Sequence, residues 1–223
     1  MFTRVPHLHL TLGKPSRPGS PIPRRATARW HHLEPADQPT RTCPQCTLHH
    51  THGTTTQAWA YHPAHQRLCP RHYQWATPSS HRAPLNTCAL PELSQAHHAH
   101  RRLTRRPDAT TAYQWASSIT TRWYDHQQHL TRRWHNRLPR LAATNPPPAG
   151  GKSWTLTARD AVTYPETVTL ARHLSRTPRP QADPGFLGHT ASTLGLDRLV
   201  LPPDDLLWTW IHTQQQPARH ECQ

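Results

Sequence analysis

The chain has 223 residues, of which 34% are hydrophobic and 25 are prolines, so no stretch is rich enough in apolar side chains to build a large core alone. Its formal net charge of +14 comes from residues 1–142, which hold 19 Lys and Arg against 5 Asp and Glu, whereas residues 143–223 hold 7 of each kind. No apolar run is long enough to span a membrane and no secretory signal is visible, so we expect a soluble, cytoplasmic protein. The charge asymmetry predicts an N-terminal part that faces a polyanion, although abundant arginine is also typical of chains encoded by GC-rich genomes.

Residues 1–40 contain seven prolines, several arginines and no periodic apolar pattern, which predicts a flexible basic arm. The segment that follows, 41–76, contains most of the cysteines. It favours one short strand over 58–61, where Trp59 and Tyr61 share a face.

Two helices are predicted after the cysteine-containing segment. Residues 91–106 begin with Pro91, which suits the first position of a helix, and Pro107 ends that helix. Residues 112–138 form the second helix, straight or bent near His126, because their apolar residues keep a 3.6-residue spacing. This stripe consists of Ala112, Trp115, Ile119, Trp123, His126, Leu130, Trp134 and Leu138.

The clearest linker is 143–152, which combines three prolines with two glycines. Beyond it, 153–223 should form a small neutral helical region, in which Pro165 opens a helix, a short helix lies near 188–196, and Asp204 or Asp205 caps another over 206–213. The predicted fold is mainly α. Region 41–142 should begin with a small zinc-ribbon-like or treble-clef-like module that contains a short β-hairpin. Long amphipathic helices follow in the same region.

The cysteines provide the strongest chemical signal. Cys43 and Cys46 are separated by two residues, and after 22 more residues Cys69 and His72 repeat that spacing. Such pairs can turn four side chains toward one ion, and three thiolates with one imidazole are a common closed set for structural zinc. We therefore expect Zn²⁺ at Cys43, Cys46, Cys69 and His72. With 21 histidines in the chain, the alternative is that Cys69 and His72 are unlinked, or that Cys88 replaces His72.

A catalytic zinc site is the less favoured alternative. His32 and Glu34 followed by the Cys43–Cys46 pair superficially resemble the signature of nucleobase deaminases. However, only eight residues separate Glu34 from Cys43, too few to bring both motifs to one ion. The chain has 12 acidic residues and no nucleophile elbow, Walker loop or paired-carboxylate motif, so we expect no enzymatic activity.

Two arginine clusters accompany the predicted helices and suggest contacts with the phosphates of DNA. Arginine on an amphipathic helix is, alternatively, often only the solvated face, and a tryptophan stripe is more often core than a platform for bases. The candidate nucleic-acid-binding residues are Arg101, Arg102, Arg105, Arg106, Arg132, Arg133, Arg137 and Arg140.

The R-x-CP-x-C sequence at 41–46, Trp59, the C-x2-H at 69–72 and PEL..A...HRRL over 91–103 together resemble the TniQ family, in a short variant. This resemblance implies a zinc-ribbon-like module that helps to bind DNA or select a target site in transposition, and that contacts a transposition ATPase. We therefore predict a non-enzymatic, zinc-stabilised DNA-binding protein that associates with the nucleoid. The alternative is a zinc-dependent adaptor that binds another protein through the Trp-rich helix or the C-terminal region.

Overall fold

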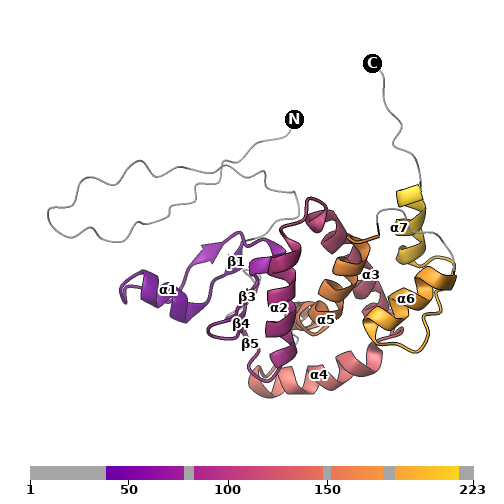
Figure 1. The fold of residues 1–223 in the computed structure, drawn as a ribbon. Helices are drawn as coiled ribbons and strands as arrows, with labels where there is room; N and C mark the ends of the chain where they lie inside the picture. The colour runs from indigo at the N-terminus through magenta and orange to yellow at the C-terminus, as the bar shows by residue number, and fades with distance from the viewer. Residues whose placement is uncertain (1–38, 78–82, 148–151, 178–183, 216–223) are drawn as a thin grey trace, which may run out of the picture. The chain divides into compact units, whose positions relative to one another are not determined.

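The structure, a computed structural model, describes residues 39–77, 83–147, 152–177 and 184–215. Seven α-helices and five short strands lie in these ranges, so the prediction of a mainly helical fold with a short β-hairpin is confirmed (Figure 1). None of the described helices is both long enough and apolar enough to cross a membrane. Nearly all of the predicted arm, 1–40, lies outside the described residues.

The first part of the described chain is a two-stranded sheet whose strands are connected through a helix. Strand β1 (Thr40–Arg41) pairs antiparallel with β2 (Trp59–Ala60), which confirms a strand within the predicted range 58–61. Between them lies α1 (Pro44–His50), which the sequence did not suggest. Its Pro44 occupies the first helical turn, where proline costs no hydrogen bond.

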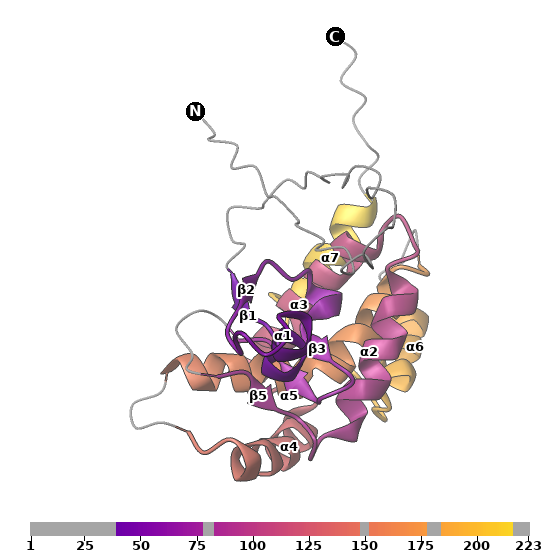
Figure 2. The same ribbon diagram turned by 90° about the vertical axis from the view of Figure 1, so that its left-hand side faces the viewer.

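A three-stranded antiparallel sheet follows. The 3₁₀ helix η1 (Ala64–Gln66) leads into β3 (Leu68–Cys69), which pairs with β4 (Gln74–Trp75), and β4 pairs with β5 (Leu85–Asn86). Both η1 and β3 lie beside α2 (Pro91–Leu103) (Figure 2). Trp75 is buried, and its ring meets that of Tyr164 edge-on, with the centroids 5.0 Å apart. The sheet therefore shares a core with the helices.

The predicted helix 112–138 is divided into α3 (Ala109–Asp125) and α4 (Thr131–Thr144). Gln127 and His129, in the connection, have φ of 53° and 49°, a left-handed conformation that no α-helix can include. Most of the apolar stripe is nevertheless buried on both helices, with Trp123 and Trp134 fully covered, whereas His126 is exposed. Helix α2 begins at Pro91 as predicted and ends at Leu103, slightly before the predicted end.

Helix α5 (Lys152–Leu174) packs against α2, α3, α4 and α6 (Pro184–Leu194) (Figure 1). Pro165 lies inside α5 rather than at its start, because the preceding turns bury Ala158, Ala161 and Val162 and this packing outweighs the preference of proline. The predicted division at 143–152 is therefore not a boundary between two cores: residues on both sides of it belong to one hydrophobic cluster. Residues 148–151 of that linker lie outside the described part.

The last helix is α7 (Leu206–Gln215), which packs on α3. The predicted cap is formed by Asp205, whose Oδ1 accepts a hydrogen bond from the backbone nitrogen of Leu207 over 2.8 Å. The short helix expected near 188–196 is α6, which begins and ends a few residues earlier. Its C-terminus is followed by Gly195, whose φ of 65° suits glycine.

Candidate metal centre

The four predicted metal ligands come from two turns that face each other. Cys43 immediately precedes α1 and Cys46 lies in its first turn, so their spacing places both on one side of the helix. Cys69 ends β3, and His72 lies in the turn between β3 and β4. Tyr73, with φ of 52°, completes that turn. The two x2-spaced pairs thus meet although 22 residues separate them.

The distances among the four ligand atoms fit one small ion. His72 Nδ1 lies 3.3 Å from the Sγ atoms of Cys43 and Cys46 and 3.7 Å from that of Cys69, and the Sγ atoms of Cys46 and Cys69 are 3.7 Å apart. All four atoms lie within 4.8 Å of one another and could hold a metal ion. Tetrahedral zinc with ordinary bond lengths would place sulfur atoms about 3.8 Å apart and sulfur about 3.6 Å from nitrogen.

The clustered thiols are difficult to ionise without a cation. Burial, together with the hydrogen bond and charge of Cys69, raises the pKa of Cys46 to about 12. Burial likewise raises the pKa of Cys43. Three adjacent thiolates repel one another unless a metal ion compensates their charge, so metal binding here would release protons.

Local hydrogen bonds fix the two ligand-bearing turns. Cys43 accepts hydrogen bonds at its carbonyl from the backbone nitrogen and the hydroxyl of Thr47, at 2.9 and 3.1 Å. On the other side, the backbone nitrogen and hydroxyl of Thr87 donate to the carbonyl of Tyr73, at 2.7 and 2.9 Å. A bound ion would therefore tie α1 to the three-stranded sheet, which is the role of a structural site.

Cys88 does not belong to this cluster. Cys88 is exposed, and the group of potential ligands in the described residues contains His72 in its place. Cys222 and the pair His32 and Glu34 lie outside the described residues, so the catalytic alternative is not tested.

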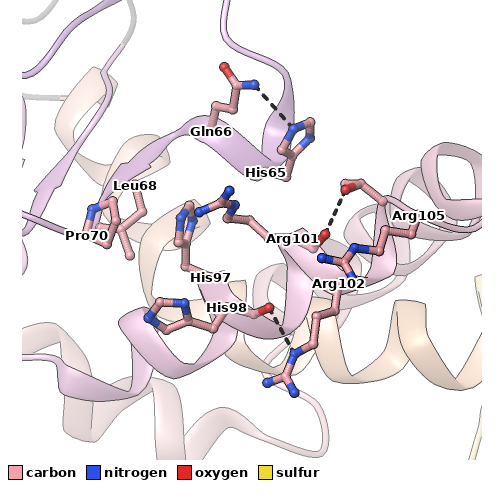
Figure 3. Close-up of a pocket in the computed structure, with 10 residues that line it drawn as sticks. His65, Gln66, Leu68, Pro70, His97, His98, Arg101, Arg102 and Arg105 are labelled. Carbon is pink, nitrogen blue, oxygen red and sulfur yellow. Dashed lines mark hydrogen bonds between the residues drawn. The ribbon is translucent and has the colours of Figure 1, made fainter.

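The arginines at the end of α2 face two hollows in the surface. Arg101, Arg102 and Arg105 line a pocket of about 840 Å³ (Figure 3). Arg102 and Arg106 line a second one, of about 250 Å³, together with Arg172 and Arg176 of α5 and the turn after it. The sequence did not suggest the last two, because Arg172 and Arg176 stand among neutral residues and are brought to α2 only by helix packing.

Three of the four candidate arginines on α4 contact other parts of the protein. Arg137 is mostly buried and pairs with Glu166 and Glu92. Arg133 donates to the carbonyls of Leu194 and Gly195. Arg137 thus pairs with an acid on α5, and Arg133 binds the carbonyls at the C-terminal end of α6. The long arginine side chains on α4 are able to reach these neighbouring elements. Arg140 similarly reaches Glu92 and the carbonyl of Ala89, and only Arg132 remains as an exposed arginine without such a contact in the described structure.

Comparison with protein-family models, with curated proteins and with solved structures finds no match. The interpretation of the site therefore depends on its own geometry. That geometry places three thiols and one imidazole around a common centre, in a module that lies beside an arginine-lined helix.

Proposed function

We propose that this chain is a non-enzymatic DNA-binding protein in which zinc orders the small module and α2 contacts phosphates. The observation that carries the proposal is the pair of pockets that share Arg102. Six arginines line them together, and no Asp or Glu from the described residues is part of either lining. They are Arg101, Arg102, Arg105, Arg106, Arg172 and Arg176.

The chemistry of these residues suits a phosphodiester backbone. Guanidinium groups are always charged and can form two parallel hydrogen bonds to one phosphate. In the described structure Arg101, Arg102 and Arg105 form no ion pair with an acidic side chain, whereas Arg106 has only a long contact of 3.8 Å with Asp108. Positive charge is thus left available on the surface rather than neutralised within the fold.

Zinc is the proposed ion because of the ligand set. Three soft thiolates and one imidazole at tetrahedral spacing favour zinc over the hard cations, which prefer oxygen. With four protein ligands the site has no open position for water or substrate, so its role is to stabilise the module. The metal then contributes to DNA binding indirectly, by holding η1 and β3 beside α2.

Within this reading, the chain is a short relative of the TniQ family that acts in transposition or target-site selection and contacts a transposition ATPase. Two features support the relationship. The C-x2-C and C-x2-H pairs converge on one centre, and PEL..A...HRRL forms α2, which carries Arg101 and Arg102. On this proposal the protein acts in the cytoplasm, at the nucleoid.

A protein adaptor is the second candidate, and two of the three tryptophans of the Trp-rich helix are not available to it. Trp123 and Trp134 are fully buried in the core and cannot contact a partner. Exposed large apolar side chains lie on the module, at Leu48, Trp59 and Tyr73, and in the C-terminal region, at Leu156 and Val200. The guanidinium carbon of Arg41 lies 4.4 Å from the centre of the Trp59 ring, so part of this surface is already covered.

Fluorescence anisotropy with labelled duplex DNA tests the proposal. We expect binding at low salt, with a logarithmic slope of about −0.9 per phosphate contacted. Arg102→Glu should weaken binding strongly because Arg102 lines both pockets, whereas Arg198→Glu, at an exposed arginine that lines neither pocket, is the matched control. Absence of binding at low salt, or equal losses in the two variants, would contradict the proposal.

A further inference from the structure

The larger pocket lies between the metal-binding module and α2. Figure 3 shows His97, Arg101 and Arg102 of α2 on one side, with Arg105 in the turn that follows the helix. The opposite side is formed by the 3₁₀ helix and the strand after it, with His65, Gln66, Leu68 and Pro70. The pocket is therefore a shared feature of two parts of the fold.

The electrostatics of this pocket are positive. Its arginines carry three charges, and no acidic side chain among the described residues pairs with them or lines the pocket. Such a concentration of like charge is unfavourable in the free protein and is relieved when an anion enters. Oxygen atoms of a phosphate could accept from several of these guanidinium groups at once.

The histidines add neutral hydrogen-bonding groups. His97 is buried, and its Nδ1 atom has no hydrogen-bond partner in the described structure. Burial lowers the pKa of His97 to about 4, and the charges of His98 and Arg101 contribute in the same direction. A neutral imidazole keeps one N–H donor, and a buried polar atom without a partner is a cost that a ligand or water would remove.

The size of the pocket points to more than an isolated ion. Its volume of about 840 Å³ falls in the range of about 300–1,000 Å³ that is typical of small-molecule sites. Leu68 and Pro70 add apolar surface to one side. A phosphate with its attached sugar would fill such a space better than a free phosphate.

We infer that this pocket binds a phosphate with its sugar, as part of a nucleic-acid strand, and that Arg101 and Arg105 are its principal phosphate contacts. The inference rests on the proposed DNA binding, which it deepens by naming the place where the strand is held. Because Leu68 and Pro70 flank the metal ligand Cys69, the ion holds one wall of the pocket. Binding of the metal and binding of the phosphate are therefore coupled, and each strengthens the other.

Deoxyadenosine monophosphate and deoxyadenosine are the direct probes, titrated by calorimetry into the metal-loaded full chain. We expect the nucleotide to bind and the nucleoside, which lacks the phosphate, not to bind. The double change Arg101→Gln with Arg105→Gln should lower the affinity for the nucleotide by about tenfold or more, the loss expected for hydrogen bonds to a charged group. Removing the metal with a chelator should weaken it as well.

The control removes the same charge elsewhere. Arg122→Gln with Arg198→Gln changes two surface arginines that line neither pocket and are not among the candidate DNA contacts, and should leave the nucleotide affinity within about twofold, as surface changes usually do. Circular dichroism and metal content check that both double variants fold. Equal losses in the two would overturn the inference, as would binding of the nucleoside as tightly as the nucleotide.

Duplex DNA, measured in parallel, separates this inference from the proposed function. If duplex DNA binds but the Arg101 and Arg105 variant binds it as tightly as the original, the pocket inference fails and the proposed function stands. If the nucleotide binds and duplex DNA does not bind at low salt, the proposed function fails and the strand assignment fails with it. A single-stranded oligonucleotide with and without a 5′-phosphate shows which source fills the pocket: equal affinities indicate an internal phosphate, and a requirement for the 5′-phosphate indicates a strand end.

Discussion

Arg137 and Glu166 form a two-bond ion pair that joins α4 to α5. Nη1 of the arginine donates to Oε2 over 2.6 Å, and Nη2 donates to Oε1 over 2.9 Å. The side chains are only 12% and 7% exposed. Trp134 Nε1 donates to the same carboxylate over 3.1 Å, and Nη1 of Arg137 also reaches the carbonyl of Val162. The Glu166 carboxylate of α5 therefore binds two side chains of α4, Trp134 and Arg137, and ties the two helices together.

Glu166→Ala should lower the free energy of unfolding by about 3–5 kcal/mol, because it leaves the guanidinium of Arg137 buried without its main partner. Arg132→Ala, at an exposed position of α4 near its start, should alter it by no more than about 0.5 kcal/mol. Urea denaturation followed by circular dichroism measures both. Similar stabilities for the two variants would show that the ion pair contributes little.

The cluster of potential metal ligands could be predicted from the sequence because the spacing that forms each pair is local. Spacing of two residues fixes Cys43 with Cys46 and Cys69 with His72, and each pair lies within one turn. The buried tryptophans on α3 and α4 could be predicted for a similar reason, since helical periodicity is also local. The connections between helices are harder to predict, because they follow no regular spacing of residues. The break between α3 and α4 requires residues such as Gln127 to adopt positive φ, which their side chains do not reveal.

The roles of the arginines could not be predicted, because charge alone does not show which side chain finds an acid. Arg137 and Arg101 look alike in the sequence, but Arg137 faces Glu166 across a helix contact and Arg101 lines an open pocket. The position of Pro165 inside α5 could not be predicted either, because it also depends on contacts with other parts of the fold. Packing of the residues before it outweighs the local preference of proline to begin a helix.

Metal analysis of protein purified without a histidine tag should give about one zinc ion per chain, as a closed four-ligand site requires. Cys43→Ser should lose that ion, because Cys43 Sγ lies 3.3 Å from the Nδ1 atom of His72 and belongs to the ligand group. Cys88→Ser is the matched control, since Cys88 is exposed and outside the group. Loss of zinc from the Cys88 variant would assign the site to a different ligand set.

His173 should make stability depend on pH. Its ring is buried, and Nε2 lies 2.9 Å from the hydroxyl of Thr190. Burial lowers the pKa of His173 to about 4, helped by the nearby His189 and Arg176. An unfolded histidine has a pKa of about 6.5. The neutral ring is therefore favoured by folding, and its contribution is fully present above pH 6.5 and lost as the pH falls toward 4.

His173→Gln removes this titration and keeps a polar group near Thr190. Relative to the variant, the original protein should lose up to about 1.4 kcal/mol of unfolding free energy for each pH unit between 6.5 and 4. The metal site titrates equally in both proteins, so it cancels from the difference. Denaturation curves at several pH values give the result, and parallel pH profiles would exclude the assigned role of His173.

Asp205 joins two elements through its two carboxylate oxygens. Oδ1 caps α7 by accepting from the backbone nitrogen of Leu207 over 2.8 Å, and Oδ2 accepts from Trp123 Nε1 of α3 over 2.7 Å. Asp205→Ala should cost about 1–3 kcal/mol for the unpaired indole nitrogen, and about 1 kcal/mol more for the lost cap.

Asp204, the neighbouring acid, is exposed and pairs with Arg122 at the surface. Asp204→Ala should therefore cost only about 0–1 kcal/mol. Thermal unfolding of the two variants compares them directly. A smaller loss for Asp205→Ala than for Asp204→Ala would mean that the buried link between α3 and α7 is not what holds α7 in place.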